Sequence, residues 1–427
     1  MEEWQSGLMH RFRKPAGAKA SHEFKSHLFR MVILSIETSC DETAVSVVRA
    51  EGQLESPRFT ILGNALYSQT AIHSEYGGVY PNLAKREHAK NLVPLFEKAL
   101  SEAGLISNFQ FLISNEKEAE IKKILEREQG LEEQLTSFLR KYDKPPVDMI
   151  AVTAGPGLEP ALWVGIQFAK ALGLAWNIPI VPTNHMEGHI ASVLLQSSSD
   201  PQILNLKSKI IFPAVALLIS GGHTEIVLVE HWGTYDILGE TRDDAVGEAF
   251  DKVARMLGLP YPGGPAISAL AEEAIQQRTL ASSIHLPRPM IHSEDLDFSF
   301  SGLKTAVLYT IRDIKTGLTD ATKAEIAREF EDAAVDVLIS KTERALIEAN
   351  AKTLIIAGGV IANKKIREAF SKLISEKYPE ISFFMPTKEL STDNSVMIAM
   401  AAYIEILVHP ELLKNTPDFR AEGNLKL

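Results

Sequence analysis

The chain has 427 residues, of which 45% are hydrophobic and 23% are charged, which is typical of a soluble protein large enough for two ordinary domains. Its single cysteine, Cys40, excludes an intramolecular disulfide framework and indicates a reducing, cytoplasmic location, and no apolar run reaches the roughly 18 residues of a membrane span. The formal net charge of −11 argues against nucleic-acid binding over the whole surface but allows a local basic patch.

Residues 1–30 differ from the rest of the chain. They carry a net charge of +3, from six Lys or Arg residues and three Glu residues, and a strand-like run starts only at Met31. An organellar transit peptide is one interpretation, which the early acids and the lack of an amphipathic repeat disfavour. We favour a disordered extension, or a segment upstream of a true start at Met31.

Two later segments share one pattern of an apolar run, a small turn and a second apolar run. They are VILSIETSCDETAVSVV, at 32–48, and AVALLISGGHTEIVLV, at 214–229. Each pattern predicts a β-hairpin, and each hairpin is followed by helical and βα-like segments. The repetition indicates a duplicated α/β lobe. Two such turns facing each other across a cleft would hold phosphates through backbone N–H groups.

A helical insertion is predicted at about 105–146. Its apolar residues recur at helical spacing among many charges, with Gly130 as an interruption, which indicates an amphipathic helix or a helical hairpin. We expect this insertion to pack on one lobe rather than to serve as a docking helix.

A third glycine-containing segment, TLIIAGGVIANKKIREAF, starts at Thr353. It predicts a buried strand, a turn at Gly358 and Gly359, and a helix that begins near Asn363. Glycine lets a ligand approach the strand end, and a helix N-terminus favours an anion. Together with the two hairpins, this segment indicates the nucleoside end of one site.

Two histidines, His185 and His189, lie four residues apart in NHMEGHIASVLL, so a helix places them on one face, where they can share a metal ion. Zinc peptidases use H-E-x-x-H, whereas the order here is H-M-E-G-H. Glu187 then lies about 200° around the helix from His185 and points away from a shared ion. Asp393 is the candidate third ligand, although a helix N-cap explains an aspartate at that position equally well.

Nine segments taken together resemble the bacterial form of the tRNA N6-adenosine threonylcarbamoyltransferases, the TsaD/Gcp family, and they cover nearly all of the chain from Val32 to about Tyr403 except the insertion. These segments are IETSCDETAVSVV, HSEYGGVYPNLAKREHAKNL, TAGPGL, NHMEGHIAS, LLISGGHTEIVLV, GEAFDKVARMLGLPYPGGPAI, FSFSGLKTAV, IIAGGVIAN and STDNSVMIA. The resemblance implies an α/β fold of two duplicated actin-like ATPase (ASKHA) lobes with a nucleotide cleft between them. We expect the first lobe at 31–208 plus about 388–427 and the second at 209–387.

The resemblance also implies an activity. Such an enzyme transfers the threonylcarbamoyl group from threonylcarbamoyl-adenylate to the N6 amine of adenosine 37 in tRNAs that read codons beginning with adenine, and it releases AMP. The implied partners are tRNA, a TsaB-type paralogue, a TsaE-type ATPase and a TsaC-type synthase that supplies the adenylate. No membrane is involved.

Carried over to this sequence, the family's pattern assigns three groups of residues. His185, His189 and Asp393 would bind one divalent metal, with Fe²⁺ the usual ion and Zn²⁺ the alternative. Asp41 and Glu42 would be catalytic, assisting proton removal from the attacking amine. The substrate would contact Leu218, Ile219, Ser220, Gly221, Gly222, Glu248, Asp251, Gly264 and Asn363. One departure bears on this set, because Ser268 stands where some relatives have an acid.

Three alternatives stay open. A metalloprotease would rest on the histidine pair alone, and a small-molecule kinase of the same fold would have no need of that pair. A non-catalytic paralogue would serve as a scaffold, and such relatives lose the histidines. The segment AKREHAK, at 84–90, is the local basic patch that we expect to contact tRNA through Lys85 and Arg86.

Overall fold

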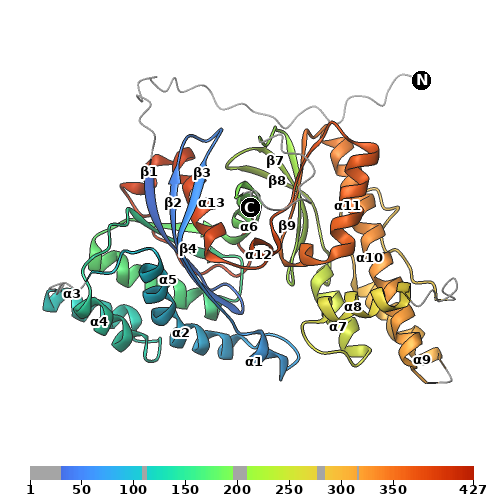
Figure 1. The fold of residues 1–427 in the computed structure, drawn as a ribbon, viewed down its shortest axis with the longest axis horizontal. Helices are drawn as coiled ribbons and strands as arrows, with labels where there is room; N and C mark the ends of the chain where they lie inside the picture. The colour runs from blue at the N-terminus through green and yellow to red at the C-terminus, as the bar shows by residue number, and fades with distance from the viewer. Residues whose placement is uncertain (1–29, 108–112, 196–208, 277–283, 315–316) are drawn as a thin grey trace, which may run out of the picture.

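The computed structural model describes residues 30–107, 113–195, 209–276, 284–314 and 317–427. These residues form two five-stranded sheets with helices around and between them (Figure 1). The first sheet contains β1 (Arg30–Glu37), β2 (Glu42–Glu51), β3 (Arg58–Ser68), β4 (Met149–Gly155) and β5 (Ile180–Asn184). The second contains β6 (Ala214–Ile219), β7 (Thr224–His231), β8 (Thr234–Glu240), β9 (Thr353–Ala357) and β10 (Ser382–Phe384). The expected extension falls on residues 1–29, outside the described ones, and β1 starts at Arg30.

The two sheets have the same topology. Their strand orders are β3-β2-β1-β4-β5 and β8-β7-β6-β9-β10, with three antiparallel strands followed by two parallel ones in each case. Both predicted hairpins are present, as β1–β2 and β6–β7. β6 and β4 are buried on both faces, as expected of apolar strands covered by helices. The predicted fold class, two duplicated α/β lobes, is confirmed.

The helices surround each sheet and also separate the two sheets. The first half contributes α1 (Thr70–Ser74), α2 (Pro81–Glu102), α3 (Asn115–Leu125), α4 (Leu131–Lys141), α5 (Glu159–Trp176), α6 (His185–Ala191) and the short 3₁₀ turn η1 (Ser192–Leu194). The remainder are α7 (Val246–Met256), α8 (Gly263–Gln276), α9 (Ser301–Asp313), α10 (Asp320–Glu348), η2 (Gly359–Ala362), α11 (Lys364–Lys377), α12 (Lys388–Ser391), α13 (Ser395–Val408) and η3 (Pro410–Leu413). None of the helices in the described ranges is both long and apolar enough to cross a membrane.

Three hydrophobic clusters hold this arrangement together. One joins the first sheet to α2, α3, α4 and α5, and a second joins the other sheet to α7, α8, α9, α10 and α11. The third lies between the two sheets and contains residues of both, together with the apolar residues of α6 and most of α13 (Figure 1). This central cluster fixes α6 and α13 between the lobes, because an interior packed as densely as a crystal leaves little freedom to move.

The insertion is a helical hairpin on the first lobe. Gly130, with φ of +78°, lies between α3 and α4, and Phe138 of α4 packs on Phe96 of α2 with ring centroids 4.6 Å apart. This packing is what we expected of the insertion. The C-terminal helix α13 also packs on the first sheet, against β1 and β2. The residue boundaries between the lobes stay a prediction.

Candidate functional site

His185 and His189 lie on α6, which starts directly after β5. The Asn184 side chain accepts a hydrogen bond from Met186 N at 2.8 Å, so α6 begins at His185 itself. Both imidazoles then point the same way, and the Nε2 atoms of both lie 3.3 Å from Asp393 Oδ1. One ligand atom from each of the three residues lies within 4.8 Å of the others. The structure therefore brings together the three residues predicted as metal ligands.

Asp393 is free for this role because its neighbour caps the helix. The N-cap of α13 is Asn394, whose side chain accepts a hydrogen bond from Met397 N at 3.0 Å. The capping explanation for Asp393 is therefore wrong. Gly188 completes the arrangement, because a Cβ at this position would lie 3.1 Å from Met397 Cγ and Ile398 Cδ1. Glycine lets α6 and α13 approach closely, which brings Asp393 to the two histidines.

A buried carboxylate, Glu37 at the end of β1, holds His185 from the other side. Its Oε2 lies 3.2 Å from His185 Nδ1 and accepts a hydrogen bond from Thr153, and its Oε1 accepts one from Ser39 N. Burial raises the pKa of Glu37, but His185 outweighs burial and keeps the pKa below its ordinary value. A carboxylate on the far nitrogen of a ligand histidine fixes the ring and its tautomer. Our sequence predictions did not include Glu37.

The charges of this region suit a cation. Glu37, Asp41, Glu42 and Asp393 gather here, and no Lys or Arg among the described residues forms an ion pair with any of them. His189 Nδ1 is buried without a hydrogen-bond partner in the described part of the chain. The histidines offset only part of this negative charge, and each buried carboxylate that lacks a cation costs several kcal/mol. Two imidazoles and a carboxylate, with open positions beside them, are a donor set for a divalent transition metal.

The turn between β1 and β2 places Asp41 and Glu42 beside these ligands. Thr70 Oγ1 donates to Asp41 Oδ2 at 3.4 Å, and Ser68 Oγ donates to Glu42 Oε1 at 3.2 Å. Burial raises the pKa of Glu42 to about 10, with further contributions from Asp41 and Asp393. A nearby cation would lower this pKa, and a carboxyl group whose pKa lies far from its ordinary value suits a residue that exchanges a proton. We call residues 39–42 the acidic turn.

The turn between β6 and β7 has the opposite character. Leu218 and Ile219 are fully buried in β6, so their side chains are core residues, and the accessible part is Ser220, Gly221 and Gly222. Ser220 Oγ accepts hydrogen bonds from Gly222 N and His223 N, at 3.3 and 3.0 Å. A Cβ on either glycine would meet no atom within 4 Å, so the space above them is open. We call residues 220–223 the glycine turn.

His223 also lies near the three candidate metal ligands, which we call the triad, and was absent from our predictions. Burial lowers its pKa to about 4, and His185 and His189 lower it further through their charge. The imidazole is therefore neutral at pH 7 and retains both a donor and an acceptor. Both hairpin turns thus face the triad, one from each lobe.

The other predicted substrate residues continue from the glycine turn along the second lobe. The start of α7 packs against this turn, since a Cβ on Gly247 would lie 2.6 Å from Ser220 O. One turn further along α7, Asp251 accepts a hydrogen bond from Gly263 N at 2.7 Å and so holds the segment that contains Gly264. Glu248 instead forms an ion pair with Lys252 at 2.7 Å and is 45% exposed.

Asn363 is the last of the predicted substrate residues along the second lobe, and its side chain is hydrogen-bonded to protein groups. Its amide nitrogen donates to Ser268 Oγ at 2.7 Å and to Glu331 Oε1 at 2.8 Å, and its oxygen caps α11 by accepting from Ile366 N. The position that departs from the family's pattern, Ser268, is thus part of this network. The structure places Asn363 at the expected helix start, where its side chain orders α8, α10 and α11.

Sequence comparisons decide which family these residues belong to. The family model TsaD, described as tRNA N6-adenosine threonylcarbamoyltransferase, matches residues 60–108 and 136–400. The chain is also 41% identical over 392 residues to a protein of Herminiimonas arsenicoxydans named tRNA N6-adenosine threonylcarbamoyltransferase, with 92% of this chain and 97% of that protein covered. The chain belongs to the TsaD family.

Solved structures resemble this member of the TsaD family more distantly. The HypF protein of T. kodakarensis is 13% identical, with a TM-score of 0.48 and coverage of 91% of this chain and 49% of that chain. An activator of 2-hydroxyisocaproyl-CoA dehydratase from Clostridium difficile, solved with ADPNP, is 11% identical, with a TM-score of 0.41 and coverage of 91% and 100%.

Glu187, the glutamate of the histidine motif, faces away from the triad of this TsaD member. It lines a separate cavity with Glu405 of α13 and the C-terminal segment. Burial and the Glu405 charge raise its pKa to about 8. A metallopeptidase needs this carboxylate at the metal-bound water, so the histidine pair does not form a peptidase site.

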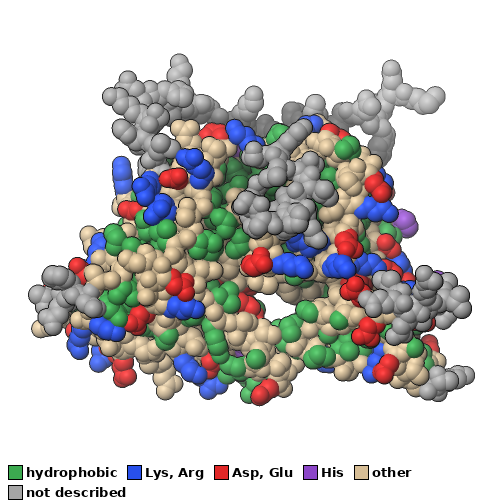
Figure 2. All heavy atoms as spheres, in the orientation of Figure 1, with side chains coloured by type: hydrophobic (Ala, Val, Ile, Leu, Met, Phe, Trp, Pro, Cys, Tyr) green, Lys and Arg blue, Asp and Glu red, His purple; other side chains and the backbone are tan. Residues whose placement is uncertain are grey.

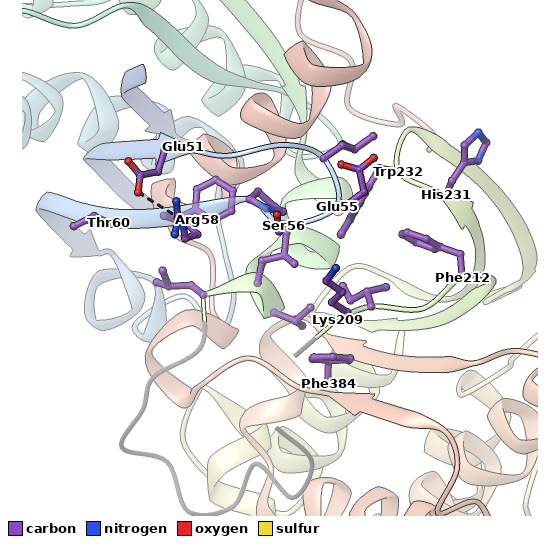
Figure 3. A pocket seen from close by; sticks show the side chains of 17 residues that line it. Glu51, Glu55, Ser56, Arg58, Thr60, Lys209, Phe212, His231, Trp232 and Phe384 are labelled. Atoms are coloured by element: carbon purple, nitrogen blue, oxygen red, sulfur yellow. Dashed lines mark ion pairs between the residues drawn. The ribbon is translucent and has the colours of Figure 1, made fainter. Parts of the chain in front are cut away.

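A cavity of about 760 Å³ between the lobes of this TsaD member is lined by none of the predicted site residues (Figure 3). Phe212, Trp232 and Phe384 of the second lobe face the Glu51–Arg58 pair of the first lobe across it. Arg58 Nε lies 3.6 Å from Glu51 Oε1, and this exposed pair is the one salt bridge between described residues that line the cavity. The groups suited to chemistry are at the triad instead.

Proposed function

We propose that this chain transfers the threonylcarbamoyl group of threonylcarbamoyl-adenylate to the N6 amine of adenosine 37 in tRNA. The observation that carries the proposal is the His185–His189–Asp393 triad between the acidic turn and the glycine turn, in a chain of the TsaD family. The N6 nitrogen forms a bond to the carbamoyl carbon, the bond from that carbon to the phosphate oxygen breaks, and AMP leaves with the electron pair.

The two turns divide this work. The glycine turn and the N-terminus of α7 suit the phosphate of the adenylate, because the space above Gly221 and Gly222 is open and a helix N-terminus favours an anion. The acidic turn suits the attacking amine, because Asp41 is placed to accept the proton that the amine loses, with the Glu42 carboxyl group beside it. Holding the two reactants together in this way supplies a large part of the rate.

His185, His189 and Asp393 would hold one divalent metal, with Fe²⁺ favoured and Zn²⁺ as the alternative. When bound, the ion supplies Lewis acidity toward the carbamoyl oxygen. Glu37 keeps the His185 ring in position for it.

We infer the remaining partners from the family. A TsaC-type synthase would supply the adenylate, and a TsaB-type paralogue and a TsaE-type ATPase would assist with tRNA. The tRNA substrate favours the cytoplasm as the place of action.

Reconstitution tests the proposal. The full chain is combined with threonine, bicarbonate, ATP, the adenylate-forming synthase, accessory proteins and tRNA, and nucleosides are analysed by mass spectrometry. Wild type is expected to yield threonylcarbamoyladenosine, and His185→Ala is expected to yield at least roughly a hundredfold less. A non-catalytic scaffold gives no product without a second transferase, and equal product from both proteins would refute the role of the triad.

A further inference from the structure

Two exposed tyrosines form a stacked pair outside the site described above. Tyr76 and Tyr80 are 64% and 54% exposed, and their rings stack with centroids 6.2 Å apart and planes at 26°. The other exposed tyrosine among the described residues, Tyr309, is a single ring with the Arg312 guanidinium over it at 4.8 Å. A pair of parallel aromatic faces open to solvent is the usual feature by which proteins bind an unpaired nucleobase.

Backbone hydrogen bonds hold the segment between these tyrosines in shape. Tyr76 N and Gly78 N both donate to His73 O, at 3.0 and 3.3 Å, and Tyr80 N donates to His73 Nδ1 at 3.3 Å. Gly77 and Gly78, with φ of +68° and +154°, make this tight path available. His73 itself is fully buried, so the ring pair is carried by a fixed support.

The same support places the pair at the opening between the lobes. Gln69 accepts a hydrogen bond from His73 Nε2 at 3.1 Å, and its own backbone N donates to Asp41 O in the acidic turn at 2.9 Å. From the other lobe, the Arg255 guanidinium of α7 donates to Gly77 O. In Figure 1, α1 and α7 approach each other from the two lobes, and Figure 2 shows an opening between the two halves of the molecule above them. The segment that carries the tyrosines is therefore tied to the acidic turn, on the side proposed for the amine.

An exposed cation follows the pair along the chain, six residues after Tyr80. Arg86, one turn into α2, is exposed and forms no ion pair with another residue in the described ranges. Lys85 instead pairs with the buried Glu128 of the insertion at 3.2 Å. Of the two basic residues expected to contact tRNA, Arg86 is thus the one available to a phosphate.

We infer that Tyr76 and Tyr80 form a stacking platform for an unpaired anticodon-loop base next to the target adenosine, with Arg86 on the adjoining phosphate. This inference rests on the proposed function. Reaching the N6 amine inside the cleft requires the target base to leave its stack, and its neighbour then needs another surface to stack on. The two rings supply that surface at the mouth of the cleft, without any base-specific hydrogen bond.

The test uses the full chain with its accessory proteins and an anticodon stem-loop RNA that carries 2-aminopurine beside the target adenosine. We compare wild type with the double variant Tyr76→Ala/Tyr80→Ala and with the matched control Tyr76→Phe/Tyr80→Phe. We expect wild type and the Phe variant to quench 2-aminopurine. The Ala variant is expected to lose the quench and raise the KM for tRNA roughly five- to one-hundredfold. Adenylate binding stays unchanged in all three.

Two results would overturn the inference while leaving the transfer activity intact. One is an Ala variant with wild-type quenching and wild-type KM for tRNA. The other is an Ala variant that binds tRNA normally but loses an accessory protein in size-exclusion chromatography, which would assign the rings to a protein partner. Failure of the wild-type protein to make the modified nucleoside would instead refute the proposed function.

Discussion

The acidic turn and the glycine turn occupy equivalent places in the two sheets but have opposite chemistry. Each joins the first two strands of its sheet, and both face the triad. The acidic turn carries Asp41 and Glu42, and no Lys or Arg among the described residues pairs with them. The glycine turn carries no acidic or basic side chain except His223, whose lowered pKa leaves it uncharged at pH 7. Duplication has thus supplied the same support twice, for two different reactants.

This difference explains how one cleft can accept both an anion and an amine. Phosphate is repelled by carboxylates, so it suits the glycine turn, which carries none and is open to solvent. A nucleophilic amine must lose a proton, which suits a carboxylate. The predictions below change one turn at a time, in order of decreasing effect.

Replacing the acid of the first turn is expected to have the largest effect. Glu42→Gln keeps the size and hydrogen-bonding capacity of the side chain but removes its ability to exchange a proton. We expect kcat to fall roughly a hundredfold with adenylate affinity unchanged. Single-turnover transfer and adenylate titration measure the two quantities, and Asp41→Asn shows which carboxylate is the base. Full activity in both variants would contradict an acid–base role for this turn.

Removing the support of His185 is expected to act on the metal first. Glu37→Gln loses the charge that fixes the imidazole, so we expect metal affinity to weaken about 10- to 100-fold. Competition with a chelator measures this affinity without an activity assay. Glu248→Gln, which alters an exposed ion pair on α7, is the control. Equal affinity in wild type and Glu37→Gln would show that Glu37 only packs.

A charge in the glycine turn should repel the phosphate. Gly222 lies in open space with an ordinary φ, so both Gly222→Asp and Gly222→Ala should fold. We expect Asp to weaken adenylate binding roughly tenfold or more, and Ala to change it little. Isothermal titration with a non-hydrolysable adenylate analogue tests this. Equal weakening by both variants would indicate a steric effect and remove the electrostatic argument.

The smallest effect concerns the buried imidazole that holds the acidic turn. His88 lies 3.0 Å from Cys40 O and 2.8 Å from Thr43 Oγ1, and burial lowers its pKa to about 4. The unfolded chain takes up this proton near pH 6.5, so the folded state loses stability as pH falls from about 6.5 to 4. We expect the free energy of unfolding of His88→Gln to fall less over this range than that of wild type, with a difference on the order of 2 kcal/mol. Tm measured against pH for both proteins tests this, and parallel curves would contradict it.

Periodicity and turn composition were enough to predict the duplicated hairpins and the insertion, because those signals are local. The same signals could not separate Asp393 from Asn394 as the helix cap, since both side chains suit an N-cap. Only the packing of α6 on α13 through Gly188 decides which one reaches the histidines.

The residues that sequence reasoning missed depend on contacts between distant segments. Glu37 ends an apolar strand, and a carboxylate in such a run is itself a signal of a buried partner. The segment AKREHAK indicated two free cations, Lys85 and Arg86. Lys85 instead pairs with Glu128, which lies in an insertion outside the family's core pattern. Leu218 and Ile219 belong to a matching motif, yet strand burial makes both of them core residues.

The central claim is that the triad binds a metal ion that the transfer reaction needs. The most direct test measures bound metal by mass spectrometry and single-turnover transfer on the same samples of wild type, Asp393→Asn and Glu187→Gln, each loaded with Fe²⁺ or Zn²⁺. We predict that Asp393→Asn loses both the ion and the transfer, whereas Glu187→Gln, on the same helix as the histidines but facing another cavity, keeps both. Wild-type transfer by a metal-free Asp393→Asn protein would contradict the account.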